Sequence, residues 1–582
     1  MSSTNPLRFC IVGTGFSGTA ALVHLVKALI RTKRSSDSIE IITVEERSKN
    51  GPGFPYDYDE LLPSHLCNNQ AGVMSLYDND FYDWMLENRE FLINNHFELI
   101  KETHPLTSKE EWLPDADAFY PRALFGHYLE DRYYQYFDLA KDYNIDIVPY
   151  NGYSVTDGYR NNNKFYLEII NKRSGKPVKL DGFHRVLLST GHWTVASASN
   201  SVTSKELNSP YPFYRVKRRI KQWLNDADGR KLRVFVKGMG PSGIDAVMSL
   251  VSDGSFQYNT QGQIVGFTPA GLCDHLEIFV GSRCGFFPAV RGDKPDYEFK
   301  YLTEDTFTEL EKTVGHKLLL EDILSLIDAE LKHATSGEIN WSDVSNPKFT
   351  SAFEKLNYDK TCSVSNNLIH SILLKVRRMK FYRYLSGTEK QMYDKLLDTH
   401  FIRTAVPIPL SNAEKLIALF ESGILKSVKM GYDISPNPIE SDNGFELSYL
   451  NESGYTYIPI DAVIYASGQS FNLHSHPSQL VKNLLEKDEL VAYEEENYVT
   501  GGVSLDSYDS YQVMCRDSKT GVVKPSEFIA SFGVLTRFWQ NERNFSAAFV
   551  EAAVWMAEQW SQLAKVEQND INVRQSEAEI VD

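Results

Sequence analysis

A glycine-rich turn near the start of the chain constrains the fold more than any other feature. The turn at 13–18 reads Gly-Thr-Gly-Phe-Ser-Gly, and it follows the short apolar run at 7–12. Apolar residues at helical spacing occupy 19–34, and a second apolar run at 39–44 ends in Glu45. The order strand, glycine turn, helix, strand and acid is typical of a βαβ unit that holds a dinucleotide.

Each residue of this turn has an expected role. Gly13 permits a sharp turn, Gly15 lets the backbone approach a pyrophosphate, and Gly18 lets helix and strand pack closely. The start of the helix offers unpaired N–H groups and positive partial charge to the phosphates. Phe16 and Ser17 lie in the same turn, so we predict that they contact the cofactor as well.

A second unit of the same kind begins near residue 232. A strand pattern at 232–236 leads into the turn Gly-Met-Gly-Pro-Ser-Gly at 238–243, and a helical pattern follows at 244–251. The next strand pattern, at 276–281, comes after a glycine-containing loop. The predicted cofactor contacts in this turn are Gly238, Gly240, Ser242 and Gly243.

The residues that follow the second strand of each unit differ in charge. Glu45 can accept hydrogen bonds from ribose hydroxyls and would repel a 2′-phosphate, as the adenosine of FAD requires. Arg283 stands at the corresponding place in the second unit, where a guanidinium can pair with a 2′-phosphate. The contrast favours FAD at the first site and NADPH at the second, while a solvated surface role for Arg283 stays open.

The 582 residues are enough for two to four domains. We predict an α/β fold with two Rossmann-like dinucleotide-binding domains, for FAD and NADPH, and a helical insertion. The expected parts are the first part of the FAD-binding domain at 1–195, the NADP-binding domain at 196–300, the helical insertion at 301–410, and the end of the NADP-binding domain with the return to the FAD-binding domain at 411–582.

Three later strand patterns end in glycine turns. The first closes a pass through the FAD-binding domain at Gly191. We expect the two others, which end at Gly468 and Gly533, to return to the same domain and complete it. All three glycines are therefore predicted cofactor contacts.

Composition excludes several other classes of protein. The formal net charge of -17 argues against a nucleic-acid partner, because no excess of cations is available for phosphates. The six cysteines include no CxxC pair, so no zinc cluster or other metal site is expected. With neither a signal-peptide pattern nor an apolar run long enough to span a bilayer, the expected location is the cytoplasm, away from membranes.

Several motifs together resemble one known group of proteins. These motifs are the first glycine turn, 53–56 with 65–74, Pro-Arg-Ala-Leu-Phe-Gly at 121–126, Ser-Arg-Cys-Gly-Phe-Phe-Pro at 282–288, and Gly-Gly-Val-Ser-Leu-Asp at 501–506. The chain resembles the FAD/NAD(P)-binding group that includes FAD-dependent urate hydroxylase and aspartate N-monooxygenase, with ornithine and lysine N-hydroxylases and Baeyer–Villiger monooxygenases as relatives. It departs from that group at Cys67, Asn69 and Ala466-Ser-Gly468.

The resemblance implies an FAD-dependent monooxygenase that uses NADPH and oxygen. In that group a C4a-hydroperoxyflavin transfers oxygen to a small molecule, for example in the N-hydroxylation of an amine or amino acid, and the cofactor carries most of the chemistry. Asn68 is the candidate catalytic residue at the flavin face, or an amide that satisfies its own loop. Arg122 either pairs with an FAD phosphate or caps local carbonyls.

Two other functions stay open from the sequence. One is an NADPH-dependent flavin reductase or dehydrogenase with an acceptor other than oxygen, and the other is a nucleotide-sensing flavoprotein without catalysis. The basic segment at 370–384, with His370, Arg377 and Arg378, favours a solvated helix face over contact with an anion or substrate. The sequence predicts neither the substrate nor the oligomeric state.

Overall fold

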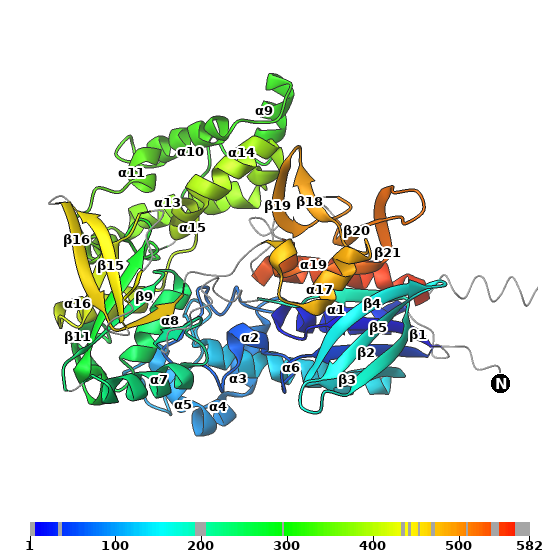
Figure 1. Cartoon of the computed structure of the whole chain (residues 1–582), viewed down its shortest axis with the longest axis horizontal. Helices are drawn as coiled ribbons and strands as arrows, with labels where there is room; N and C mark the ends of the chain where they lie inside the picture. The colour runs from blue at the N-terminus through cyan, green and yellow to red at the C-terminus, as the bar shows by residue number, and fades with distance from the viewer. Residues whose placement is uncertain are drawn as a thin grey trace, which may run out of the picture.

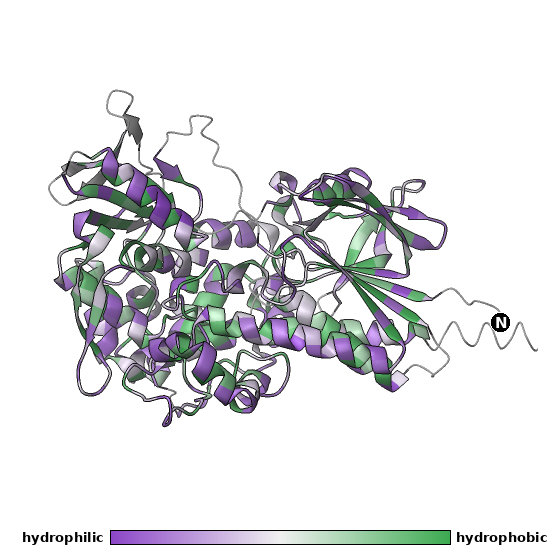
Figure 2. Ribbon diagram, turned by 90° about the horizontal axis from the view of Figure 1, so that it is seen from below, coloured by the Kyte–Doolittle hydropathy of each residue, from purple (hydrophilic) through white to green (hydrophobic). Residues whose placement is uncertain are grey.

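The computed structural model describes residues 6–32, 38–192, 205–227, 229–293, 296–431, 437–439, 444–451, 454–466, 472–507, 510–536 and 546–564. Figure 1 shows two groups of strands and helices, with the first third of the chain on the right and lower centre and the middle of the chain on the left. Figure 2 shows apolar residues gathered where helices and strands face one another, and polar residues along the outer faces.

A six-stranded sheet carries the first glycine turn. Its order is β20-β21-β7-β1-β2-β3, parallel throughout except for the edge strand β20. Successive branched and apolar residues make β1 and β2 almost fully buried, as a covered parallel sheet requires. The strands are β1 (Leu7–Val12), β2 (Ile39–Glu45), β3 (Ile145–Asn151), β7 (Arg185–Leu188), β20 (Gln512–Arg516) and β21 (Val523–Ser531).

Helices from both ends of the chain cover this sheet. Helix α1 (Phe16–Thr32) packs against α19 (Ser546–Ser561), and Phe9 of β1 stacks on Trp560 with ring centroids 5.5 Å apart. Helix α6 (Arg122–Asp142) packs against α1 as well. The C-terminal helix is therefore part of the core that supports the first glycine turn.

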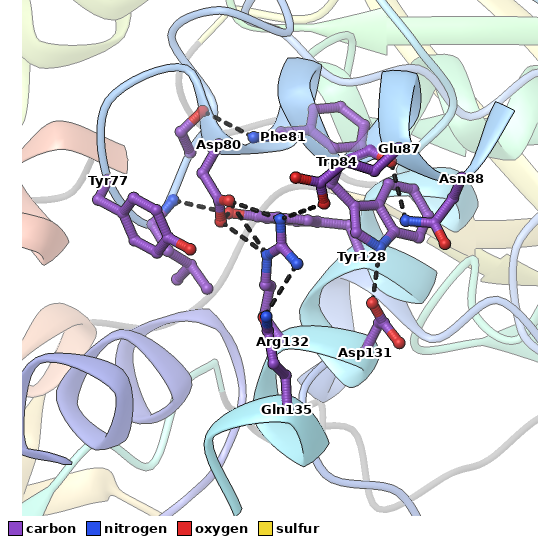
Figure 3. Close-up of polar contacts among 12 residues, drawn as sticks. Tyr77, Asp80, Phe81, Trp84, Glu87, Asn88, Tyr128, Asp131, Arg132 and Gln135 are labelled. Atoms are coloured by element: carbon purple, nitrogen blue, oxygen red, sulfur yellow. Dashed lines mark hydrogen bonds and ion pairs between the residues drawn. The ribbon is translucent and has the colours of Figure 1, made fainter. Parts of the chain in front are cut away.

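A buried ion pair fastens α3 (Asp80–Glu87) to α6, as Figure 3 shows. Arg132 donates to both carboxylate oxygens of Asp80, at 2.7 to 3.1 Å, and the Tyr128 hydroxyl donates to the same carboxylate at 2.6 Å. The side chains of Asp80 and Arg132 are 3% and 6% exposed, so each charge depends on the other. Short helices α4 (Arg89–Asn95) and α5 (Phe97–Thr103) follow α3.

A five-stranded parallel sheet carries the second glycine turn, in the order β13-β12-β9-β17-β8. Its strands are β8 (Glu206–Leu207), β9 (Leu232–Lys237), β12 (Leu276–Ser282), β13 (Leu425–Lys429) and β17 (Ala462–Tyr465). Its helices are α7 (Phe213–Asn225), α8 (Pro241–Leu250) and α16 (Leu410–Glu421). The two sheets confirm the predicted α/β class with two Rossmann-like units.

The structure corrects the expected place of the strand before Gly468. Strand β17 pairs in parallel with β9, Ala462 opposite Val234, and so belongs to the second sheet. Buried parallel strands share one apolar pattern, which does not reveal the sheet that accepts them. Gly468 itself lies outside the described residues. By contrast, β21 pairs with β7, Ile529 opposite Val186, so the chain does return to the first sheet before Gly533.

The region at 301–400 is helical, as predicted. Its helices are α9 (Thr306–Val314), α10 (Leu320–Ala334), α11 (Trp341–Ser345), α12 (Ala352–Thr361), α13 (Ser363–Arg378), α14 (Gly387–Met392) and α15 (Asp398–Ala405). Leu318 and Leu373 from this insertion share one buried apolar cluster with Val155 and Phe165 of the first part of the chain. The insertion is thus packed onto the chain that carries the first glycine turn.

Smaller antiparallel sheets complete the fold. They are formed by β4 (Tyr153–Asn161), β5 (Lys164–Asn171) and β6 (Pro177–Phe183); by β10 (Ser255–Tyr258) and β11 (Ile264–Thr268); by β14 (Asn437–Ile439), β15 (Gly444–Asn451) and β16 (Gly454–Ile460); and by β18 (Ala492–Glu495) and β19 (Tyr498–Val503). The exact bounds of the four predicted domains stay a prediction.

Candidate functional site

A cavity of about 1360 Å³ lies between the first glycine turn and the helical insertion. This volume exceeds that of an ordinary drug-sized pocket, so a dinucleotide and a small molecule fit together. Predicted site residues along its wall are Gly13, Gly15, Phe16, Ser17, Glu45, Asn68, Arg122, Gly191 and Gly533. The segment after β12 and the insertion contribute Arg291, His370, Arg377 and Arg378.

The first turn leaves room only for glycine at its key positions. Gly13 has φ +90°, and a Cβ there would overlap the carbonyl oxygen of Ser189. A Cβ on Gly18 would overlap the carbonyl oxygen of Gly13, because the start of α1 is pressed against the end of β1. The backbone therefore takes the tight strand-to-helix form that the sequence predicts.

Bare backbone also lines the mouth of this turn. A Cβ on Gly53 would lie 2.7 Å from the Cα of Gly15, so the two chains meet without side chains between them. Gly15, Phe16 and Ser17 line the cavity at the start of α1, where the first N–H groups have no partner within the helix. The hydroxyl of Thr190, also in the wall, is buried and has no hydrogen-bond partner among the described residues. This cradle fits a pyrophosphate.

Glu45 is fixed beside the turn. It ends β2 and is 6% exposed. One carboxylate oxygen accepts hydrogen bonds from the backbone N–H and the hydroxyl of Thr14, at 2.8 and 3.1 Å, and the other accepts from the N–H of Arg47 at 2.9 Å. The acid thus stands in the cavity wall with its orientation fixed by its neighbours in the chain.

The second turn has a similar backbone, but most of it lies outside the cavity wall. Gly238 has φ +129°, and a Cβ on Gly243 would overlap the carbonyl oxygen of Gly238. Of this turn, the cavity wall includes Pro241, whereas Gly240 and Ser242 are not part of it. Arg283 directly follows β12, is exposed, and donates to the hydroxyl of Thr399 in α15 at 3.2 Å.

Asn68 and Arg122 lie in the wall but have partners that the sequence does not indicate. The carbonyl of Asn68 accepts a hydrogen bond from Arg291 at 3.1 Å. Arg122 forms an ion pair with Asp245 of α8, whose carboxylate also accepts from the Tyr211 hydroxyl. Arg122 therefore joins the two units of the fold, and its contact with an FAD phosphate stays a prediction.

His65 extends this contact between the units. Its ring is fully buried, and Nε2 lies 3.2 Å from the carbonyl oxygen of Asp245 and 3.3 Å from the hydroxyl of Ser249. Burial lowers the pKa of His65 to about 4, so the ring is neutral at physiological pH. The structural role that we assign to His65 is to hold α8 against the loop at 62–66.

Sequence reasoning missed Arg291 and underrated the basic face of α13. Arg291 stands alone between Val290 and Gly292, so its local sequence gives no signal. The expected solvated face is wrong for His370, which is 6% exposed and lies 3.3 Å from a guanidinium nitrogen of Arg291. The i, i+7 spacing of His370 and Arg377 was the available signal, because it places both on one side of a helix.

The two glycine turns, each between a buried parallel strand and a helix of its own sheet, define a protein with two Rossmann-like units. A family model described as FAD-NAD(P)-binding matches residues 10–193. That match covers the first unit and confirms the predicted FAD/NAD(P)-binding resemblance there.

Comparison with whole proteins gives more distant similarities. The chain is 22% identical to Uncharacterized protein YdhS of Escherichia coli (strain K12) over 489 residues, which cover 79% of this chain and 83% of that protein. Among solved structures, the reduced form of ornithine hydroxylase PvdA from Pseudomonas aeruginosa is 13% identical, with 96% of this chain and 98% of that chain covered and a TM-score of 0.48. L-lysine 6-monooxygenase from Pseudomonas syringae is also 13% identical, with 96% of this chain and 99% of that chain covered and a TM-score of 0.48.

No helix within the described ranges is both long and apolar enough to cross a membrane.

Proposed function

We propose that the protein is an FAD-dependent monooxygenase that uses NADPH and oxygen and acts on a small molecule. The observation that carries the proposal is the cavity, which joins the glycine cradle and Glu45 to a wall built by the insertion. A cavity that continues beyond the dinucleotide cradle leaves space for a substrate next to the reactive ring.

The proposed FAD contacts are backbone and one acid. Gly13, Gly15 and Gly18 would let the pyrophosphate approach the start of α1, and Glu45 would accept from the ribose hydroxyls. NADPH would use the second turn and Arg283. When bound, FAD supplies the redox and oxygen chemistry.

The chain's own task is to position the reactants and to exclude water. Asn68 is our candidate for contact with the reactive end of the cavity, since its amide can donate and accept without adding charge. The hydrogen bond from Arg291 to the Asn68 carbonyl holds this loop in place. Insertion residues close the other wall, which limits the entry of solvent to the reacting centre.

The first test is whether the purified protein contains FAD and whether NADPH bleaches it. With oxygen present, we expect oxygen uptake that follows NADPH oxidation, and a delay between mixing the reduced protein with oxygen and the return of the oxidised flavin spectrum. Turnover with a dye acceptor but without oxygen uptake would indicate the reductase. Failure of NADPH to bleach the flavin would indicate the nucleotide sensor.

Partners and location follow from the same proposal. The partners would be a small-molecule substrate and oxygen, and the net charge of -17 gives no basis for nucleic-acid binding. All six cysteines are free, which fits the reducing environment of the cytoplasm.

A further inference from the structure

One wall of the cavity is rich in guanidinium groups. Arg291 reaches it from the segment after β12, and α13 contributes His370, Arg377 and Arg378. On a helix, His370 and Arg377 are separated by about two turns and lie on the same side. Three arginines from two separate parts of the chain thus line one cavity.

Arg291 is the residue that most needs a ligand. Its Nη2 donates to the Asn68 carbonyl at 3.1 Å, and its Nη1 lies 3.3 Å from Nε2 of His370, but its buried Nε has no hydrogen-bond partner. Within the described part of the chain, no carboxylate forms an ion pair with Arg291. Burial lowers the pKa of Arg291 to about 10, and no neighbouring acid offsets that effect.

A largely buried cation without an anion is costly, and proteins normally pair such a charge. His370 does not provide an anion, since burial, followed by the nearby Arg291 charge, lowers its pKa to about 3 and keeps the ring neutral. Its Nε2 can then accept the hydrogen bond from Arg291.

The other arginines leave the wall positively charged. Burial lowers the pKa of Arg377, while Tyr393 and Asp398 act in the opposite direction, so Asp398 offsets part of this charge. Arg378 is exposed at the cavity and has no ion-pair partner in the ranges that the structure describes. Asp398 therefore acts on Arg377, while Arg291 and Arg378 have no ion pair within the described residues.

We propose that this wall, which we call the arginine wall (Arg291, His370, Arg377 and Arg378), binds an oxyanion of the substrate, either a carboxylate or a phosphate. The inference rests on the proposed function, because it takes the ligand of the arginine wall to be the substrate that reacts in the same cavity. A planar guanidinium binds either group through two parallel hydrogen bonds, and the free Nε of Arg291 supplies one of these donors.

The arginine wall is separate from the expected cofactor phosphates. The pyrophosphate cradle is formed by residues 13–18 at the start of α1, and the expected 2′-phosphate contact is Arg283, which is not part of the cavity wall. Neither assignment uses the arginine wall, so a third anion is needed to complete it.

The test is binding to the oxidised FAD-loaded protein, which requires no turnover. Succinate and inorganic phosphate serve as the two probes, and neutral succinamide serves as the control. Binding is followed by changes in the flavin absorption spectrum and by the rise in melting temperature. We expect succinate or phosphate to bind with saturation and succinamide to have no effect; the better probe identifies a carboxylate or a phosphate as the ligand group.

Variants locate the site. Arg291→Met should weaken binding of the better probe at least tenfold. Arg291→Lys should retain part of the affinity, because lysine keeps the positive charge but lacks the paired N–H donors of a guanidinium. Lys375→Met is the matched control, since it removes a cation from α13 outside the cavity wall, and it should leave binding unchanged. Circular dichroism of each variant checks that the fold is intact.

Three results would overturn the inference: equal binding of succinate and succinamide, equal probe affinity in Arg291→Met and the parent protein, or a loss in Arg291→Met confined to NADPH. Probe binding that depends on Arg291 in a protein without oxygen uptake would refute only the proposed monooxygenase. Oxygen uptake in a protein that binds neither probe would refute only the arginine wall.

Discussion

The two glycine turns have nearly the same backbone but lie in different surroundings. In both, the glycine at the sixth position of the turn is pressed against the carbonyl of the first glycine, Gly18 on Gly13 and Gly243 on Gly238. The first turn opens along the large cavity, whereas the second contributes Pro241 to it. The motif therefore fixes the local turn, and the neighbouring elements decide what the turn can reach.

The residues after the second strands sharpen this difference. Glu45 is buried and held by backbone N–H groups, so its orientation is set before any ligand binds. Arg283 is exposed and contacts Thr399 of the insertion. We expect the first site to hold its dinucleotide tightly and the second to exchange it, as a reducing substrate must.

The largest expected effect on flavin content comes from closing each turn in a matched pair of variants. Gly18→Ala places a Cβ on the Gly13 carbonyl, and overpacking of this kind costs about 1–3 kcal/mol. We expect the purified variant to contain at most about a tenth of the normal flavin, as judged by the ratio of visible to ultraviolet absorbance. Gly243→Ala should keep its flavin and lose reduction by NADPH. If both variants lost flavin equally, the assignment of one dinucleotide to each turn would be wrong.

A second pair of variants compares a buried ion pair of the first unit with an exposed one. Asp80→Ala leaves the buried Arg132 with only the exposed Glu87 carboxylate at 3.5 Å, and breaking a buried pair costs about 3–5 kcal/mol. Urea unfolding should show this loss. Asp138→Ala, which removes an exposed pair with Lys141, should change stability by less than about 1 kcal/mol. Equal effects of the two variants would contradict the burial argument.

A smaller effect is expected at the acid of the first unit. Glu45→Gln keeps the shape but removes the charge that Thr14 and Arg47 hydrogen-bond, and such bonds contribute about 1.5–3 kcal/mol. FAD affinity of the reconstituted protein should fall about tenfold or more. Glu168→Gln, at an acid outside the cavity wall that pairs with Lys179, is the control and should bind FAD normally.

The smallest effect is expected at Arg283. Because this residue is exposed, its ion pair with a 2′-phosphate should contribute at most about 1 kcal/mol. Arg283→Met should raise the KM for NADPH about fivefold and leave the KM for NADH unchanged. The KM of Arg283→Lys for NADPH should lie between those of the parent protein and Arg283→Met. An equal rise for both nucleotides would show that Arg283 does not read the 2′-phosphate.

The features that sequence predicted well are local ones. The turn at 13–18, Glu45 at the end of its strand and the helices of the insertion depend on spacing within a few tens of residues. Their physical causes, such as the absence of a Cβ or the burial of a strand, are visible in the residues themselves.

Features that join distant segments were not predictable. Strand β17 was assigned to the wrong sheet because two parallel sheets accept the same apolar pattern. Asp245, the partner of Arg122, is 123 positions away along the chain. Arg291 donates to the carbonyl of Asn68, which is 223 positions away. Charges of this kind acquire their meaning only when the fold brings them together.

The ion pair between Arg122 and Asp245 also limits how the protein can move. Its side chains are 15% and 7% exposed, and the two partners belong to helices of different dinucleotide units. Rotating one unit away from the other would break this ion pair and leave two charged side chains in a place where little water can solvate them. Hydride delivery is therefore expected within a fixed frame, by movement of the nicotinamide rather than by a swinging domain.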